Sequence, residues 1–155
     1  MKIKYKITIS TLSFFSCMLL AYVLWLSLRP VEIVTVHHRS SGFSDILVKN
    51  FPLTDKGKID WWLENSKNIR KKYQIPKADK DGAFYLTFWL FGEGYKEEGK
   101  YDRLCFKDMQ APTNCIDKNA VFSVGNNRKE EVLFTVYDGR YRMEKGGKII
   151  KLKDE

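Results

Sequence analysis

The sequence predicts an α+β fold, in which an N-terminal transmembrane helix precedes a mainly antiparallel β-sheet domain with one long amphipathic helix. Three observations lead to this prediction. An uncharged run occupies residues 7–28, apolar residues follow at helical spacing after Pro52, and short β-type runs dominate from Ala83 onward. Several strands beside one helix are typical of the α+β class. We therefore divide the chain into residues 1–6, a transmembrane helix at 7–28 and a single α+β domain at 29–155.

The uncharged run is long enough to cross a bilayer. Its 22 residues would form a helix of ~33 Å, and the hydrocarbon core of a bilayer is ~30 Å thick. Tyr5, Tyr22 and Trp25 fall near its ends, where aromatic rings favour the membrane interface. A cleaved signal peptide is the alternative, but its apolar region is normally about 7 to 15 residues long and ends in small residues. We expect a retained signal-anchor that contacts the lipid bilayer through residues 7–28.

Basic residues beside the run predict its orientation. Lys2, Lys4 and Lys6 precede it, whereas Arg29 and Arg39 are the nearby basic residues on the other side. Because lysine and arginine accumulate on the cytoplasmic side, we expect residues 1–6 in the cytoplasm and the domain across the membrane.

The first part of the domain is predicted to be a hairpin followed by a helix. Residues 31–36 and 45–49 are β-type runs on either side of a turn at 40–42. Thr54 or Asp55 would cap a helix that continues to Tyr73, before Pro76. Its apolar positions recur at near-helical spacing and are Ile59, Trp62, Leu63, Ile69 and Tyr73. Trp61 lies off this stripe, so it either packs on a sheet edge or marks a contact surface.

The second part of the domain is predicted to be almost entirely β. Residues 83–91 form the most apolar run outside the membrane and suit a central strand, and 92–94 would turn the chain. Further strands are expected at 101–106, 120–124, 132–137, 140–144 and 148–152. Asp138-Gly139 and Gly146-Gly147 are hairpin signals between the last three. We expect six to eight strands in an antiparallel sheet.

Two cysteines outside the membrane run are predicted to pair. Cys105 and Cys115 flank a short loop that would bring their sulfurs together. In an oxidising compartment such a crosslink contributes ~3 kcal/mol in the chain-entropy model. Two free buried thiols are the alternative. We expect Cys17 to be a small apolar filler in the membrane.

Charge and metal-ligand patterns exclude several classes of function. Subtracting the three N-terminal lysines from the net charge of +8 leaves +5, spread among acidic residues. We expect a solvated surface and no nucleic-acid partner, while an affinity for anionic headgroups or an acidic partner stays open. The only histidines, His37 and His38, are adjacent and would point to opposite faces of a strand, which disfavours zinc. We predict no metal and no cofactor.

No motif of a known catalytic machinery occurs in the chain, and we predict no catalytic residue. Segment 92–103 is the strongest candidate, because Glu93, Glu97, Glu98 and Asp102 would supply an acid/base pair. The lysines and glycines among them favour an exposed hairpin or loop with compensated charge. Cys105 as a nucleophile would need one of the two histidines. The residues that we single out as candidates for binding are Trp61, Glu93, Tyr95, Glu97 and Glu98.

Four segments carry a resemblance to a known family. They are residues 24–34 (LWLSLRPVEIV), residues 43–63 (FSDILVKNFPLTDKGKIDWWL), residues 91–106 (FGEGYKEEGKYDRLCF) and residues 114–116 (NCI). The chain resembles the enterobacterial putative membrane proteins that are grouped as a domain-of-unknown-function family. This resemblance implies a small single-pass protein of a Gram-negative inner membrane, with its C-terminal domain in the periplasm. It brings no assigned activity and no functional residues.

The function that we expect is a non-enzymatic binding module with a protein partner in the periplasm or inner membrane. An immunity-like role against a delivered toxin suits the size and the anchor, by analogy. Two alternatives remain open. One is an envelope enzyme that uses the acidic residues of segment 92–103. The other is an adaptor of a larger membrane complex, whose transmembrane helix packs through its small residues, Ser10, Ser13, Ser16, Cys17 and Ala21.

Overall fold

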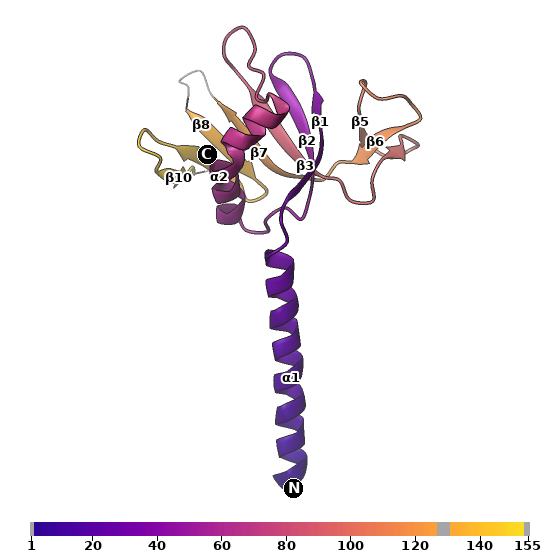
Figure 1. Cartoon of the computed structure of the whole chain (residues 1–155), viewed down its shortest axis with the longest axis vertical. Helices are drawn as coiled ribbons and strands as arrows, with labels where there is room; N and C mark the ends of the chain where they lie inside the picture. Colours follow the sequence, from indigo (N-terminus) through magenta and orange to yellow (C-terminus); the bar gives the residue numbers. More distant parts are fainter. Residues whose placement is uncertain (1, 127–130, 154–155) are drawn as a thin grey trace. The chain divides into compact units, whose positions relative to one another are not determined.

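The computed structural model describes residues 2–126 and 131–153, with side chains from Tyr5 onward (Figure 1). The chain divides into two compact units, Met1–Pro30 and Val31–Glu155. The first unit is one helix with a short tail, and the second unit holds every strand. The predicted α+β class, with an N-terminal apolar helix before a mainly antiparallel sheet domain, is confirmed.

The first unit consists of helix α1 (Lys2–Ser27). Its segment Tyr5–Ser27 is long and apolar enough to cross a membrane. Hydroxyl groups within it bond back to the helix, since Thr11 Oγ1 donates to the Ile7 carbonyl at 3.1 Å and Ser27 Oγ donates to the Val23 carbonyl at 2.9 Å. Such bonds lower the free-energy cost of a hydroxyl in lipid.

The second unit is built on a seven-stranded sheet in the order β1-β2-β3-β7-β8-β9-β10. Strands β2 and β3 are parallel, and all other neighbours are antiparallel. The strands are β1 (Glu32–His38), β2 (Phe43–Lys49), β3 (Tyr85–Leu90), β7 (Ala120–Asn126), β8 (Val132–Val136), β9 (Gly139–Met143) and β10 (Ile149–Lys151). Seven of the eight predicted strands are found in this sheet, the exception being the strand predicted at 101–106, and β3 lies in its interior as predicted.

Helix α2 (Asp55–Tyr73) connects β2 to β3, which is why these two strands can run parallel. Thr54 is the N-cap, and its side chain accepts a hydrogen bond from the Gly57 N–H at 3.1 Å. Gln74 ends the helix in a left-handed conformation. The boundaries match the prediction, but Leu63 does not belong to the buried stripe. It is 41% exposed, because a step of one residue from the buried Trp62 turns the side chain about 100° around the helix.

One face of the large sheet packs against α2. Ile46 and Val48 of β2, Phe88 of β3 and Phe134 of β8 are fully buried there with Trp62 of the helix. Trp61 also packs on this core. Its ring makes edge-to-face contacts with Phe51 and Phe88, at centroid distances of 5.1 and 5.9 Å.

The opposite face of the large sheet carries a second, three-stranded sheet, which the sequence interpretation missed. Its order is β4-β6-β5, with β4 (Lys96–Glu97), β5 (Arg103–Cys105) and β6 (Thr113–Asp117). The single antiparallel sheet that we predicted is therefore wrong in this segment, whereas the predicted loop between the two cysteines is present at residues 106–112. A separate small core of Leu47, Phe106 and Ile116 joins the two sheets. Because side chains alternate along a strand, Leu47 faces this core while Ile46 and Val48 face the helix.

Candidate functional site

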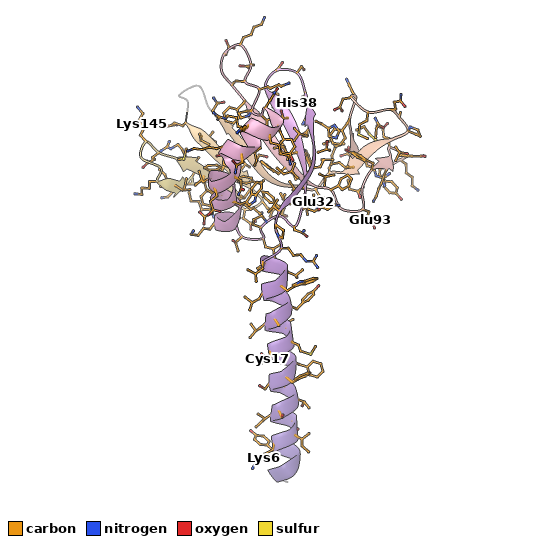
Figure 2. The ribbon with its side chains drawn as sticks, in the orientation of Figure 1. Lys6, Cys17, Glu32, His38, Glu93 and Lys145 are labelled. Carbon is orange, nitrogen blue, oxygen red and sulfur yellow. A yellow bond between two sulfur atoms is a disulfide. The ribbon has the colours of Figure 1, made fainter. Side chains whose placement is uncertain are left out.

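A cleft of about 610 Å³ opens where the β1–β2 hairpin meets the small sheet. Its walls come from His37, His38, Arg39, Ser40 and Asp45 on one side and from residues 104–108 on the other. We call it the inter-sheet cleft. In Figure 2, the label of His38 lies at the upper end of the β1–β2 hairpin.

His37 is the central side chain of this cleft. It is 5% exposed, and the register places it directly opposite Asp45 on β2. Its Nδ1 lies 2.8 Å from Asp108 Oδ2 and 3.0 Å from Oδ1, and its Nε2 lies 2.9 Å from the Tyr95 hydroxyl. The ring stacks on Phe106 with centroids 3.8 Å apart. His37 therefore links the large sheet to three residues that belong to the small sheet and its loops.

The hydrogen bonds of His37 leave it no vacant nitrogen. In the neutral ring, Nδ1–H donates to the Asp108 carboxylate, so Nε2 accepts from the Tyr95 hydroxyl. Burial, and then the nearby Asp108 carboxylate, raise the pKa of Tyr95 above its ordinary value of 10.0, which keeps the phenol protonated. A general base needs a nitrogen within reach of a substrate proton. This arrangement therefore clamps the cleft together, with both ring nitrogens of His37 already hydrogen-bonded.

A buried ion pair lies beside His37. Asp45 is 0% exposed, and its Oδ1 accepts from Trp89 Nε1 at 2.8 Å and from Arg39 Nη2 at 2.6 Å. Its Oδ2 lies 2.6 Å from Arg39 Nε but has no partner with hydrogen-bond geometry among the described residues. The side chain of Arg39 is 49% exposed, so it lies between the buried carboxylate and water. A buried carboxylate is costly without such a partner.

The two adjacent histidines point to opposite faces of the sheet, as predicted. His38 is exposed, and its Nδ1 lies 3.4 Å from the Ser44 hydroxyl. Partial burial, and then the charge of Lys77, lower the pKa of His38 from 6.5. Within residues 2–126 and 131–153, no three His, Cys, Asp or Glu side chains are grouped to hold a metal ion.

The structure joins Cys105 to Cys115 through sulfurs 2.09 Å apart. These residues face each other directly on β5 and β6, and the loop at 106–112 joins the two strands, so the predicted pairing is found. Cys105 is part of the cleft wall. A sulfur in a disulfide is not a thiolate, so the bonded Cys105 is no nucleophile.

Of the acidic residues of segment 92–103, Glu97 belongs to β4, whereas Glu93, Glu98 and Asp102 lie in the turns on either side of it, and part of their charge is compensated. Glu93 pairs with Lys96 at 2.7 Å, and Asp102 pairs with Lys118 at 2.5 Å. Figure 2 shows Glu93 at the start of this segment, away from His38. Glu97 and Glu98 are exposed.

The predicted binding residues do not form one site. Tyr95 reaches the cleft through its bond to His37, the three glutamates lie on β4 or in the turns beside it, and Trp61 packs on the opposite face of the large sheet. Sequence reasoning missed His37, Asp45 and Asp108 as a group. The one available signal was Asp45 itself, a charged residue directly before the apolar residues Ile46, Leu47 and Val48 of the same strand.

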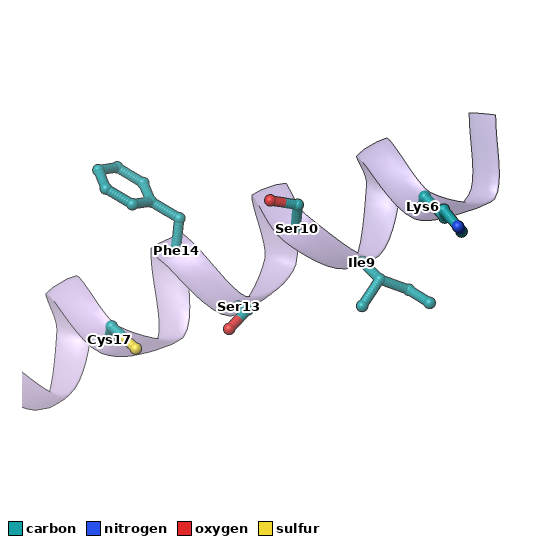
Figure 3. Close-up of a pocket in the computed structure, with 6 residues that line it drawn as sticks. All are labelled: Lys6, Ile9, Ser10, Ser13, Phe14 and Cys17. Carbon is teal, nitrogen blue, oxygen red and sulfur yellow. The ribbon is translucent and has the colours of Figure 1, made fainter. Parts of the chain in front are cut away.

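The surface of α1 has a shallow hollow of its own. It is lined by Lys6, Ile9, Ser10, Ser13, Phe14 and Cys17, and Figure 3 shows these side chains around one helix. Gaps between side chains on an isolated helix are enough to form such a hollow. It includes three of the predicted small residues, Ser10, Ser13 and Cys17.

The comparison with curated proteins gives no match, and the comparison with solved structures gives none either. A family match covers residues 2–153, and the family is described as "Enterobacterial putative membrane protein (DUF943)". The match spans both units and includes α1 and the inter-sheet cleft. The chain therefore belongs to this family of enterobacterial membrane proteins.

Proposed function

We propose that the protein is a non-enzymatic binding module, which α1 anchors in the inner membrane and whose domain binds a protein partner in the periplasm. The single observation that carries the proposal is the inter-sheet cleft with the buried carboxylate of Asp45 beneath Arg39. Hydrogen-bonding groups in a preformed cleft are the usual elements of a specific binding site.

The cleft is held in one shape by independent contacts. His37 is fixed at both ring nitrogens, and the Cys105–Cys115 disulfide holds the strand that forms the opposite wall. Such preorganisation lowers the entropy that a binding site loses when it takes up a ligand. It favours recognition over catalysis here, because the clamp uses both nitrogens of the only histidine buried in the cleft.

The anchor supports a role close to the membrane. Four residues separate Ser27 at the end of α1 from Glu32 at the start of β1, and a connection of that length spans at most ~18 Å. An immunity-like role would use this position to intercept a toxin near the bilayer. An enzyme that uses segment 92–103 has less support, because Glu93 and Asp102 are ion-paired with lysines.

Site-specific photocrosslinking in living cells tests the cleft. A photoreactive amino acid replaces the exposed Lys107 on the cleft wall, and the same replacement of the exposed Lys148, near β10, is the matched control. We expect a discrete protein adduct from position 107, and a weaker one or none from position 148. Equal adducts at both positions, or none at position 107, contradict binding in the cleft.

Two further measurements separate the other parts of the proposal. Alkaline phosphatase fused to the C-terminus should be active, because that enzyme needs an oxidising compartment. If the phosphatase is inactive there and a cytosolic fluorescent reporter in the same position is fluorescent, the periplasmic placement is contradicted. In mixed culture with a toxin-delivering sibling strain, cells without the gene should be outcompeted. Equal survival contradicts the immunity-like role and leaves the binding role standing.

A further inference from the structure

A second concave surface lies on the other face of the large sheet, between the start of β1 and the second half of α2. It is a groove of about 350 Å³, and its walls include Ile33 of β1 with Trp61, Asn65, Asn68, Lys72 and Tyr73 of α2. We call it the strand–helix groove. It shares no lining residue with the inter-sheet cleft.

One wall of the groove is the edge strand of the sheet. β1 pairs only with β2 in the part of the chain that the structure describes. Arg39 N–H donates to the Phe43 carbonyl, and hydrogen-bonded and non-hydrogen-bonded pairs alternate along an antiparallel ladder. The backbone N–H and C=O groups of Val36 and His38 therefore point away from β2, and a register shift between Ile33 and Thr35 separates them from the start of the strand. An open edge of this kind is a template for an additional strand.

The other wall presents aromatic side chains at the same level as β1. Trp61 and Tyr73 are half-buried, pack against the helix-facing core and line the groove together with Ile33. A strand added to β1 would direct every second side chain toward α2, because side chains alternate between the faces of a sheet. The groove thus favours a segment with apolar residues at alternate positions.

The charge of the groove favours an acidic occupant. Lys72 is exposed on its rim, and the last turn of α2 also carries Arg70 and Lys71. The one acidic lining residue, Glu32, lies 3.6 Å from Lys49 of β2 and is compensated by it. Positive charge therefore remains to pair with the carboxylates of a partner.

We propose that the strand–helix groove docks an extended acidic segment of a partner protein, which adds a strand to the free edge of β1. Alternate apolar side chains of this segment contact Trp61 and Tyr73, and its carboxylates face Lys72. Main-chain hydrogen bonds supply affinity and the side-chain contacts supply specificity, as in other cases of strand addition. The lining of this groove is separate from that of the cleft, although His38, whose backbone groups lie at the free edge, belongs to the cleft wall.

Peptide selection on the full-length protein tests the proposal. A displayed library of random 12-residue peptides is selected against the protein in lipid nanodiscs, after removal of peptides that bind empty nanodiscs. We expect enriched peptides that alternate apolar and acidic residues, and slower hydrogen exchange at the backbone amides of β1 when such a peptide binds. Two versions of the peptide are then N-methylated at every second amide, one at the odd positions and one at the even positions. Only the version whose methylated N–H groups would pair with β1 should lose binding, because an added strand directs every second N–H toward its neighbour.

Charge-reversal variants locate the bound peptide. Lys72→Glu should weaken peptide binding at least tenfold. Two control variants should change the binding less than threefold. They are Lys67→Glu, at an exposed position of α2 outside the groove lining, and Lys107→Glu, on the inter-sheet cleft. Enrichment of basic peptides, or no enrichment over empty nanodiscs, overturns the proposal. So does a bound peptide that leaves β1 exchange unchanged. A dimer of this chain in which two β1 edges pair also overturns the proposal. Such a dimer would be seen as hydrogen-exchange protection of β1 that rises with protein concentration in the absence of peptide.

Discussion

Asp108 and His37 are 71 residues apart in the chain and are joined across the two sheets of the domain, with Asp108 Oδ2 2.8 Å from His37 Nδ1. The same imidazole contacts Tyr95 through its other nitrogen and stacks on Phe106. A single side chain of β1 thus holds the small sheet at three points. Loss of this side chain should therefore destabilise the domain more than loss of a side chain with a single contact.

The two neighbouring histidines give a matched pair of variants for this prediction. His37→Ala should lower the free energy of unfolding by about 3 kcal/mol, because it removes two buried hydrogen bonds and a stacked ring. His38→Ala, at the exposed neighbouring position, should change it by less than about 0.5 kcal/mol. Urea unfolding of the full-length protein in detergent, followed by tryptophan fluorescence, measures both. Equal effects of the two substitutions contradict the clamp.

Substitution of Arg39 and substitution of Asp45 should lower the stability of the domain by different amounts, although the two residues form one ion pair. Arg39→Met leaves a buried carboxylate uncompensated and should cost about 3 to 5 kcal/mol of unfolding free energy. Asp45→Asn leaves Arg39 accessible to water and keeps an acceptor for Trp89, so it should cost about 1 to 2 kcal/mol. The same unfolding experiment gives both values. A larger loss for Asp45→Asn than for Arg39→Met contradicts this account.

The disulfide should stabilise the domain by ~3 kcal/mol in the chain-entropy model, because it closes a short loop in the unfolded chain. A double variant, Cys105→Ser with Cys115→Ser, should lose about this amount, and Cys17→Ser is the control that leaves it unchanged. Alkylation with a large maleimide provides a second measurement. The unreduced protein from cells should gain one adduct and the reduced protein three, since the chain has three cysteines. Three adducts without reduction mean that the bond does not form in the cell.

His38 should make stability depend on pH. Burial, and then the charge of Lys77, lower the pKa of His38 below 6.5 in the folded domain. Between the folded pKa and 6.5 the unfolded state binds more protons, so this contribution to stability is present above pH 6.5 and is lost as the pH falls through the folded pKa.

Two variants test this titration. His38→Gln should flatten the fall in unfolding free energy between pH 7 and pH 5. Lys77→Gln should raise the pKa of His38, which NMR titration of the imidazole protons can follow. A His38 pKa at or above 6.5 in the wild-type protein would remove the basis of the prediction.

The elements that sequence reasoning predicted correctly are those specified by local signals. The N-cap, predicted at Thr54 or Asp55 and found at Thr54, and Pro76 just beyond Tyr73 define α2 from residues at its own ends. The uncharged run defines α1 in the same local way. The large sheet was likewise predictable, since most of its strands have five to seven residues.

The small sheet and the cleft depend on contacts between distant residues, so they could not be predicted in the same way. A strand was predicted at 101–106, where β5 lies, but β4 has only two residues, which is too short for a periodic pattern, and β6 was not predicted. Their pairing with β6 is stabilised by the core around Leu47, which belongs to another sheet. The opposite directions of His37 and His38 followed from strand geometry, but nothing near His37 in the sequence indicated Asp108 as its partner.

The connection from Leu90 of β3 to Ala120 of β7 contains the whole small sheet, although these two strands are hydrogen-bonded neighbours. One wall of the cleft therefore comes from a single continuous segment, residues 91–119, that is inserted between two neighbouring strands of the large sheet. The register pairs of the large sheet include no residue of segment 91–119. This wall of the cleft is therefore encoded by a single continuous stretch of gene, separate from the stretches that encode the ladder.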